Sequence, residues 1–249
     1  MEISLAAEKI GSVLGLPITN SMLMTYLAGI ILLIIAYFST RKLTLIPRGF
    51  QNFMEMIIEF LFNTANDVIG DREQTKKYFP LLATIFLFIL FNNWLGLLPG
   101  VGTVGFHEVI HGKEAFIPLF RSGNADLNMT FALAIVAVFS IQIFGIIAIG
   151  FAKNTKKYLN FKGPIDFFVG ILELISEISR MISFAFRLFG NIFAGEVLLT
   201  VIALIVPYIA PLPFFGLELF VGAIQALVFT MLTLVFIKMA ITDHTAEAH

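Results

Sequence analysis

The chain has 249 residues, of which 58% are hydrophobic and only 13% are charged, and it contains 28 phenylalanines. Together with a mean hydropathy of +0.92, this composition lies far outside the globular range and predicts an integral membrane protein. A net charge of −1 argues against a nucleic-acid partner, and the absence of cysteine excludes disulfides, thiolate metal sites and thiol nucleophiles.

The first fifth of the chain predicts one membrane span. Residues 10–40 contain no charged side chain, and a transmembrane helix is expected over about 18–40. Three basic residues follow at once and place this end of the helix in the cytoplasm and the N-terminus outside: Arg41, Lys42 and Arg48. The first residues lack the basic stretch of a signal peptide and the arginine-rich composition of a transit peptide, so no cleaved leader is expected. The absence of a transit peptide favours a bacterial plasma membrane, although an organelle-encoded chain would also lack one.

Residues 47–69 predict an amphipathic helix that lies on the membrane surface, with Pro47 as its first residue. Its polar side chains share one face of the helix: Asn52, Glu55, Glu59, Asn63 and Asn66. The charged run 71–77 then closes this cytoplasmic segment.

Two further spans are expected over 77–98 and 127–152, joined by a glycine-rich external loop over 100–126. Trp94 fits the aromatic belt at the outer membrane interface. Four lysines mark the return to the cytoplasm: Lys153, Lys156, Lys157 and Lys162.

The last part predicts a long, tilted hairpin of helices over 164–205 and 214–240. Three prolines break the chain between them: Pro207, Pro211 and Pro213. The turn carries no charge and is expected outside, which places the C-terminus in the cytoplasm. The whole chain, 1–249, is therefore expected to form one all-α membrane domain with about five embedded helices and one surface helix.

Polar side chains form one stripe along the first helix of this hairpin. At about 100° per residue, seven positions fall within roughly 40° of one line: Glu173, Ser176, Arg180, Ser183, Arg187, Asn191 and Ala194. An arginine in hydrocarbon costs about 3 kcal/mol or more, so Arg187 needs a partner or a function. Glu196 points off the opposite face, and Glu218 and Gln225, seven residues apart, share a face of the last helix.

These side chains offer polar access from both ends of the hairpin without forming a continuous proton path. A guanidinium with a pKa above about 12 does not relay protons, so Arg187 interrupts the path. Two half-paths that meet at a fixed cation require another carrier between them.

The segment RLFGNIFAGE, Arg187–Glu196, together with Glu218, Gln225 and the pattern of spans, closely resembles subunit a of F-type ATP synthases over essentially the whole chain. The resemblance implies that Arg187 faces the carboxylates of a rotating ring of c subunits. It implies one half-channel from the outside lined by Asn191, Glu196, Glu218 and Gln225. A second half-channel toward the cytoplasm is implied at Glu173, Ser176 and Ser183, with Arg180 in a supporting role.

The same resemblance implies a rotary proton-transport subunit that is not itself an enzyme and has no cofactor, with ATP chemistry on other subunits. Its expected partners are the c ring, b-type peripheral-stalk subunits, other ATP synthase subunits and membrane lipid. Some members have His at the position of Glu218 and Glu at that of Glu196, so this carboxylate pair is a variant. Glu177 is expected to pair or pack, and Gly190 and Gly195 to allow close helix packing.

Two other functions fit parts of the sequence. His107, Glu108 and His111 match H-E-x-x-H, which on a helix would predict a zinc hydrolase, although a third metal ligand is missing. A stand-alone ion channel or transporter would use the same intramembrane charges. It would have to explain why the Arg187 face has no anionic partner.

Overall fold

The computed structural model describes residues 7–13, 15–41, 44, 46–98, 100–110, 113–158, 163–207 and 209–242. Its helices are α1 (Asn20–Thr40), α2 (Phe50–Ile69), α3 (Arg72–Gly96), α4 (Leu127–Ile149), α5 (Phe151–Tyr158), α6 (Pro164–Ile205) and α7 (Pro211–Ile241), with a 3₁₀ turn, η1, over Gly123–Ala125. Two antiparallel hairpins pair β1 (Lys9–Val13) with β2 (Leu16–Thr19) and β3 (Gly105–Ile110) with β4 (Lys113–Pro118).

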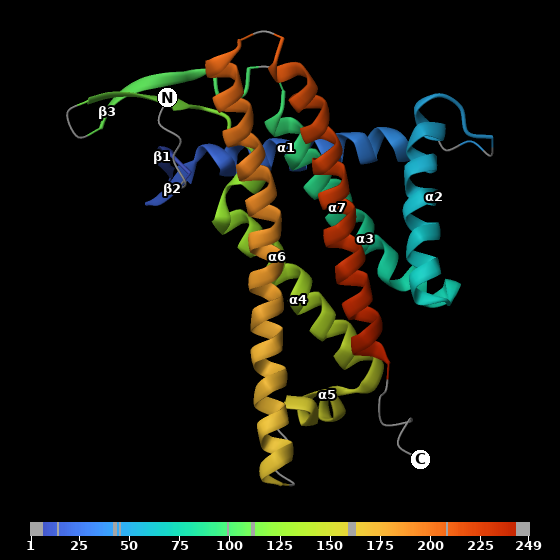
Figure 1. Ribbon diagram of the computed structural model, residues 1–249. Helices are drawn as coiled ribbons and strands as arrows, with labels where there is room; N and C mark the ends of the chain where they lie inside the picture. Colours follow the sequence, from blue (N-terminus) through green and yellow to red (C-terminus); the bar gives the residue numbers. More distant parts are fainter. Residues whose placement is uncertain are drawn as a thin grey trace.

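The expected all-α membrane fold is confirmed. Five described helices are long and apolar enough to cross a membrane, namely α1, α3, α4, α6 and α7, and α2 is not among them. With 42 residues, α6 is about 63 Å long, twice the thickness of a bilayer core, so it fits into hydrocarbon only when strongly tilted. Figure 1 shows α6 and α7 running side by side, with α1 lying crosswise to both.

The surface helix and the second span begin at other residues than the sequence pattern suggests. Helix α2 starts at Phe50, after Gly49 at φ 58°, so Pro47 stays outside the helix. Helix α3 starts at Arg72 because the Asp71 carboxylate accepts the Glu73 N–H at 2.9 Å and so caps its free amide groups. The charged run 71–77 therefore forms the first turns of a spanning helix.

The two later helix boundaries also differ. Helix α4 ends at Ile149, before Gly150 at φ 92°, and the chain continues as the short helix α5. Helix α7 starts at Pro211 because a proline in the first turn removes no intrahelical hydrogen bond. The glycine-rich loop contains the β3–β4 hairpin, which the sequence pattern does not predict.

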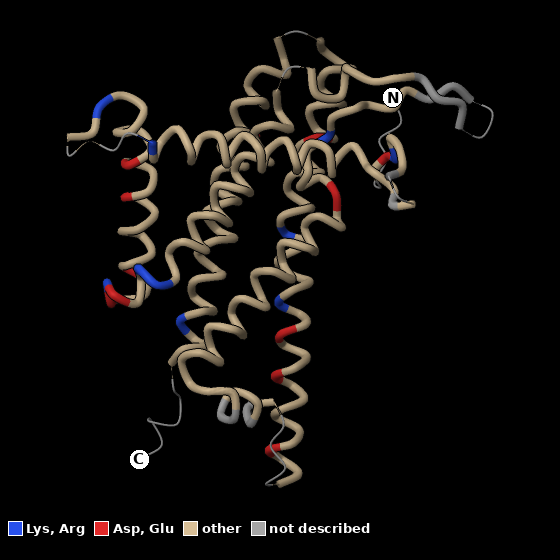
Figure 2. The backbone as a smooth tube through the Cα atoms, turned by 180° about the vertical axis from the view of Figure 1, so that it is seen from behind, with Lys and Arg blue, Asp and Glu red and all other residues tan. Residues whose placement is uncertain are grey.

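Helix α7 lies at the centre of the fold, where it packs against α2, α3, α4 and α6. Phe184 of α6 and Phe229 of α7 are both buried, with ring centroids 4.9 Å apart. Near the C-terminal end of α7, the Lys238 Nζ donates to the Val68 carbonyl oxygen at 2.7 Å, and its positive charge stabilises the C-terminal end of α2. Figure 2 shows that most charged residues lie along α6 and around α2, including the start of α3.

Buried amides join the C-terminal end of α3 to the N-terminal half of α7 and to η1. The Asn93 Nδ2 donates to the Gly222 carbonyl oxygen at 2.9 Å, and its Oδ1 accepts from the Asn124 Nδ2 at 2.7 Å. All three residues are buried. Because Gly222 has no side chain, α7 approaches Asn93 closely. This contact fixes the position of α7 along the axis of α3.

We predict that Asn93→Ala lowers the thermal stability of the protein in detergent. The substitution removes two buried hydrogen bonds, from Asn93 to the Gly222 carbonyl oxygen and from Asn124 to Asn93, and leaves the Asn124 Nδ2 with only its 3.4 Å bond to the Ile89 carbonyl oxygen, a loss of about 1–3 kcal/mol. Thermal unfolding followed by circular dichroism measures the effect, with Asn52→Ala on the exposed face of α2 as the control. Equal melting temperatures for the two variants would contradict this role.

Candidate functional site

Two cavities border α6, and they share no lining residue. The larger, of about 520 Å³, lies between the C-terminal half of α6, the N-terminal half of α7 and the segments around β4, and we term it the loop cavity. The smaller, of about 330 Å³, is bordered by three serines and two arginines of α6, and we term it the serine cavity. Along α6, the serine cavity ends at Arg187 and the loop cavity begins at Ile192.

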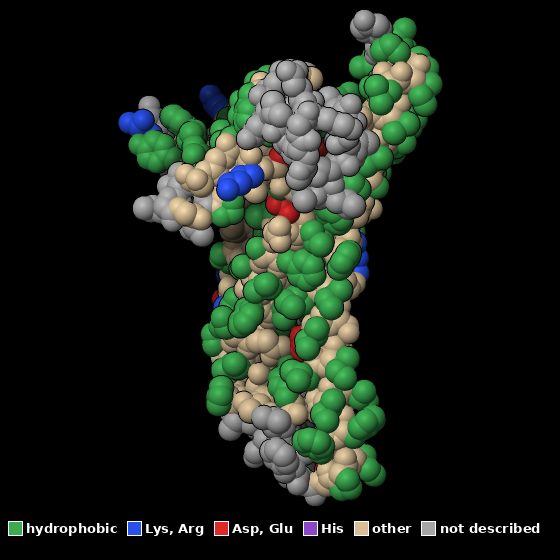
Figure 3. All heavy atoms as spheres, turned by 90° about the vertical axis from the view of Figure 1, so that its left-hand side faces the viewer, with side chains coloured by type: hydrophobic (Ala, Val, Ile, Leu, Met, Phe, Trp, Pro, Cys, Tyr) green, Lys and Arg blue, Asp and Glu red, His purple; other side chains and the backbone are tan. Residues whose placement is uncertain are grey.

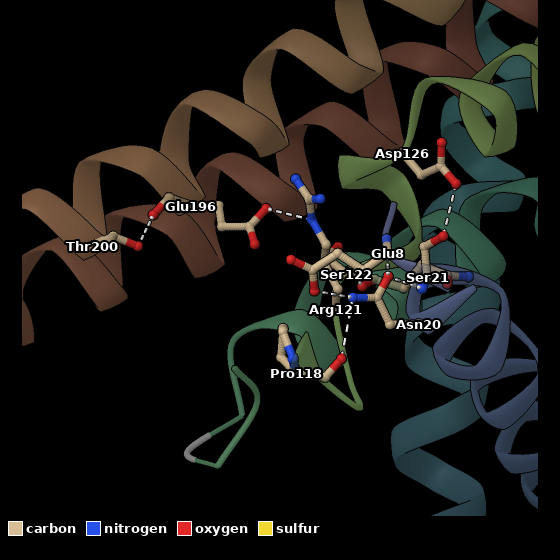
Figure 4. Close-up of polar contacts among 10 residues, drawn as sticks. Glu8, Asn20, Ser21, Pro118, Arg121, Ser122, Asp126, Glu196 and Thr200 are labelled. Carbon is tan, nitrogen blue, oxygen red and sulfur yellow. Dashed lines mark hydrogen bonds and ion pairs between the residues drawn. The ribbon is translucent and has the colours of Figure 1, made fainter. Parts of the chain in front are cut away.

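The loop cavity contains the two carboxylates expected for the outer half-channel. Glu196 of α6 forms an ion pair with Arg121, whose Nε lies 3.4 Å from its Oε2 (Figure 4). Glu218 of α7 is only 7% exposed and makes no hydrogen bond within the described part of the chain. Its carboxyl group lies directly against Gly195, where a β-carbon would overlap it.

Arg187 lies at the edge of the serine cavity and is exposed on the surface of the chain. Its Nη2 donates to the Ser183 Oγ at 3.2 Å, and its guanidinium carbon lies 5.8 Å from the Phe184 ring centroid. Among the described residues it forms no ion pair. Ser176, which precedes Arg187 on α6, is also exposed and borders the same cavity.

An amide pair lies on α6 and α7 between the two cavities. The Asn191 Nδ2 donates to the Gln225 Oε1 at 2.7 Å. Gln225 is 4% exposed, and its Nε2 has no acceptor within the described structure. The sequence-derived candidates Asn191 and Gln225 thus contact each other, and neither borders the loop cavity.

Arg180 and Glu177 form an ion pair at 2.8 Å, so Glu177 is not a partner of Arg187. The Arg180 guanidinium lies over the Phe236 ring at 3.9 Å, on the wall of the serine cavity. The hydroxyl of Tyr158, the last residue of α5, lies 3.4 Å from the Glu177 Oε1. Burial and the nearby Glu177 carboxylate raise the pKa of Tyr158 to about 12, so its hydroxyl keeps its proton at neutral pH. Glu173 is half-buried near this cluster.

The face of α6 around its polar stripe, from Glu173 to Asn191, is apolar and exposed. Figure 3 shows hydrophobic side chains along the height of that side of the molecule. Phe168, Ile175 and Phe186 are each more than half exposed. Such a surface is typical of lipid or protein contact within a membrane.

Two features of the site, the positions of Arg121 and Glu8, are not predicted by the sequence pattern. Arg121 is one of two basic residues in a loop, and only the fold brings it to Glu196. Glu8 lines the loop cavity although it lies at the other end of the chain. The close packing expected at Gly195 is found there, against Glu218, whereas a β-carbon at Gly190 would meet no atom of the described residues within 4 Å.

The structure does not support the zinc-site hypothesis. Gly105–Ile110 is a strand, β3, so His107 and Glu108 are not on the helix that an H-E-x-x-H site requires. His111 lies outside the described residues. Within the described ranges, no group of three His, Asp or Glu side chains could hold a metal ion.

Comparison with known proteins gives consistent matches over most of the chain. The ATP synthase A chain family matches residues 22–238. ATP synthase subunit a of Gloeobacter violaceus is 38% identical over 90% of this chain and 85% of its own length. The subunit a proteins of Campylobacter jejuni strain 81-176 and Moorella thermoacetica are 36% and 32% identical, over 85% and 92% of this chain and 85% and 94% of their own lengths.

We predict that Gly195→Ala destabilises the protein whereas Gly190→Ala does not. The new β-carbon at position 195 overlaps the Glu218 carboxyl group, which has to turn away from α6, so the loss is expected at the low end of the about 1–3 kcal/mol that overpacking costs. The matched change on the same helix meets open space and gains helix propensity. Thermal unfolding in detergent compares the two, and a larger loss for Gly190→Ala would contradict the packing described here.

Proposed function

Because this chain belongs to the ATP synthase subunit a family, we propose that it carries protons through two half-channels, one in each cavity, which Arg187 separates. Subunit a is the non-catalytic membrane subunit of the Fo sector, and it works with the other subunits of the synthase. The chain is accordingly a multi-pass membrane protein in which no ATP chemistry takes place. The proposal concerns how its own residues move the ion.

The guanidinium of Arg187, which is exposed and forms no ion pair with any described residue, is the observation that carries this proposal. A bare cation on an apolar helix face is strongly disfavoured in hydrocarbon. Among the described residues its one polar contact is Ser183, which carries no countercharge. An anion from another chain would remove this cost. The carboxylates of a c-subunit ring, passing one after another, fit that requirement.

The physical cycle follows from the environment of the ring carboxyl group. In lipid, burial disfavours its charged form and it keeps its proton. Opposite Arg187, the positive charge favours the carboxylate, and the proton leaves through one half-channel. After the next step of the ring, a proton from the other half-channel restores the neutral form. Each proton moved through the potential supplies about 2.3 kcal/mol per 100 mV.

The separation of the two cavities supports offset half-channels. Glu196 and Glu218 provide proton-accepting groups in the loop cavity. Ser176, Ser183 and Arg180 border the serine cavity, with Glu173 near its far end. The Asn191–Gln225 amide pair lies between them, and amides do not titrate, so protons cannot bypass the ring by that route.

The proposed orientation places the loop cavity outside and the serine cavity toward the cytoplasm. This follows the basic residues after α1, which favour the cytoplasmic side. The N-terminus is then outside and the C-terminus inside, in a bacterial plasma membrane. The exposed face of α6 would meet the c ring, and b-type stalk subunits would contact other spans.

We predict that Arg187→Ala abolishes ATP-driven proton pumping in inverted membrane vesicles that carry the assembled complex. Without the fixed cation, the ring carboxyl group is no longer deprotonated between the half-channels. Arg187→Lys is expected to fail as well, because lysine lacks the planar guanidinium and can lose its charge. Fluorescence quenching of a pH-sensitive dye measures pumping, and the exposed Arg48→Ala is the control.

Near-normal pumping by both Arg187 variants would reduce this residue to a structural role and contradict the mechanism. Ion conduction by the isolated chain, without a c ring, would instead favour a stand-alone channel. Immunoblots of the assembled complex establish that the variants are present at equal amounts.

A further inference from the structure

The N-terminal segment is fastened to the outer end of the fold by one buried amide. Asn20, which is fully buried, donates from Nδ2 to the Glu8 Oε2 at 3.3 Å and to the Pro118 carbonyl oxygen at 3.2 Å. Its Oδ1 accepts the Glu8 N–H at 3.2 Å, and its own N–H donates to the Glu8 carbonyl oxygen. Both the backbone and the carboxylate of Glu8 are therefore held in place.

This arrangement puts a third carboxylate on the wall of the loop cavity. Glu8 borders the same cavity as Glu196 and Glu218, although it comes from the segment before β1 (Figure 4). Burial raises the pKa of Glu8, the Arg121 guanidinium opposes that shift, and the Glu196 carboxylate adds to it. These two charged groups are thus close enough to act on Glu8.

Three further ionisable side chains border the loop cavity besides Glu8: Arg121, Glu196 and Glu218. Arg121 is 6% exposed and holds Glu196 by the ion pair at 3.4 Å. Glu218 is 93% buried and has no hydrogen-bond partner among the described residues, yet it borders the cavity. Buried carboxyl groups without protein partners need water or a proton. A site of this kind needs a supply of both.

We propose that Glu8 is a proton-collecting residue of the outer half-channel and that Asn20 and Arg121 are its positioning residues. The Glu8 carboxylate takes a proton from hydronium, which leaves as water, and passes it through cavity water to Glu196. Arg121 keeps the Glu196 carboxylate turned toward this route. This inference rests on the function proposed above and adds a residue outside the segment 173–225.

The test is ATP synthesis by inverted vesicles at a fixed membrane potential, with the pH of the lumen, which corresponds to the outside, varied from about 5 to 8. At acidic lumen pH, hydronium is abundant and reaches Glu196 directly, so Glu8→Gln is expected to match the unaltered protein. As the lumen pH rises, proton supply limits the rate, and Glu8→Gln is expected to fall behind by up to about tenfold.

Two comparisons separate proton collection from a structural role. Glu8→Asp keeps an ionisable group and is expected to recover most of the rate at high lumen pH. Glu59→Gln removes an exposed carboxylate of α2, away from both cavities, and is expected to leave the pH profile unmoved. An unshifted profile for Glu8→Gln, or an equal loss at every pH for Glu8→Gln and Glu8→Asp, would overturn the proposal.

Failure of this inference is distinguishable from failure of the proposed function. If Arg187→Ala abolishes synthesis at every pH and Glu8→Gln changes nothing, the two half-channels stand and the role of Glu8 falls. If Arg187→Ala retains synthesis, the proposed function itself is contradicted, whatever the behaviour of Glu8.

Discussion

An arginine that faces outward from an apolar helix is the constraint on which the rest of this structure depends. The guanidinium of Arg187 cannot give up its proton, and no carboxylate among the described residues neutralises it. Arg180 and Arg121 each have an acidic partner within the chain, at Glu177 and Glu196. Arg187 is therefore set apart from these two arginines because no acidic partner for it lies among the described residues, and the proposed function assigns that partner to another chain.

The fold keeps this cation in place while allowing water-sized space on either side of it. Helix α6 has 42 residues, and this length lets one helix border two cavities at different positions along its axis. Helix α7 closes the gap between them because Gly195 and Gly222 allow close approach to Glu218 and Asn93. The small size of these two glycines therefore allows the polar side chains of Glu218 and Asn93 to lie between the packed helices.

The sequence pattern predicted the spans and the polar stripe well, because hydrophobic length and helical periodicity are local properties. It placed Arg187 on a face away from Glu196 from geometry alone. It could not predict that Arg121 pairs with Glu196 or that Glu8 reaches the same cavity, since both contacts join segments far apart in the chain. The start of α3 at Arg72 was missed for a different reason: charged residues suggested a loop, whereas the Asp71 cap and the exposed first turns accommodate them in a helix.

The most direct test of the central claim is a disulfide cross-link between this chain and a c subunit in the assembled complex. The chain has no cysteine of its own, so a single cysteine at Gly190, exposed and one turn from Arg187, gives a clean reporter. The account predicts oxidative cross-linking to a cysteine placed beside the ring carboxyl group, and none from a cysteine at Phe139, which is exposed on α4. Absence of the first cross-link, or equal yields from both positions, would contradict the claim that the Arg187 face meets the ring.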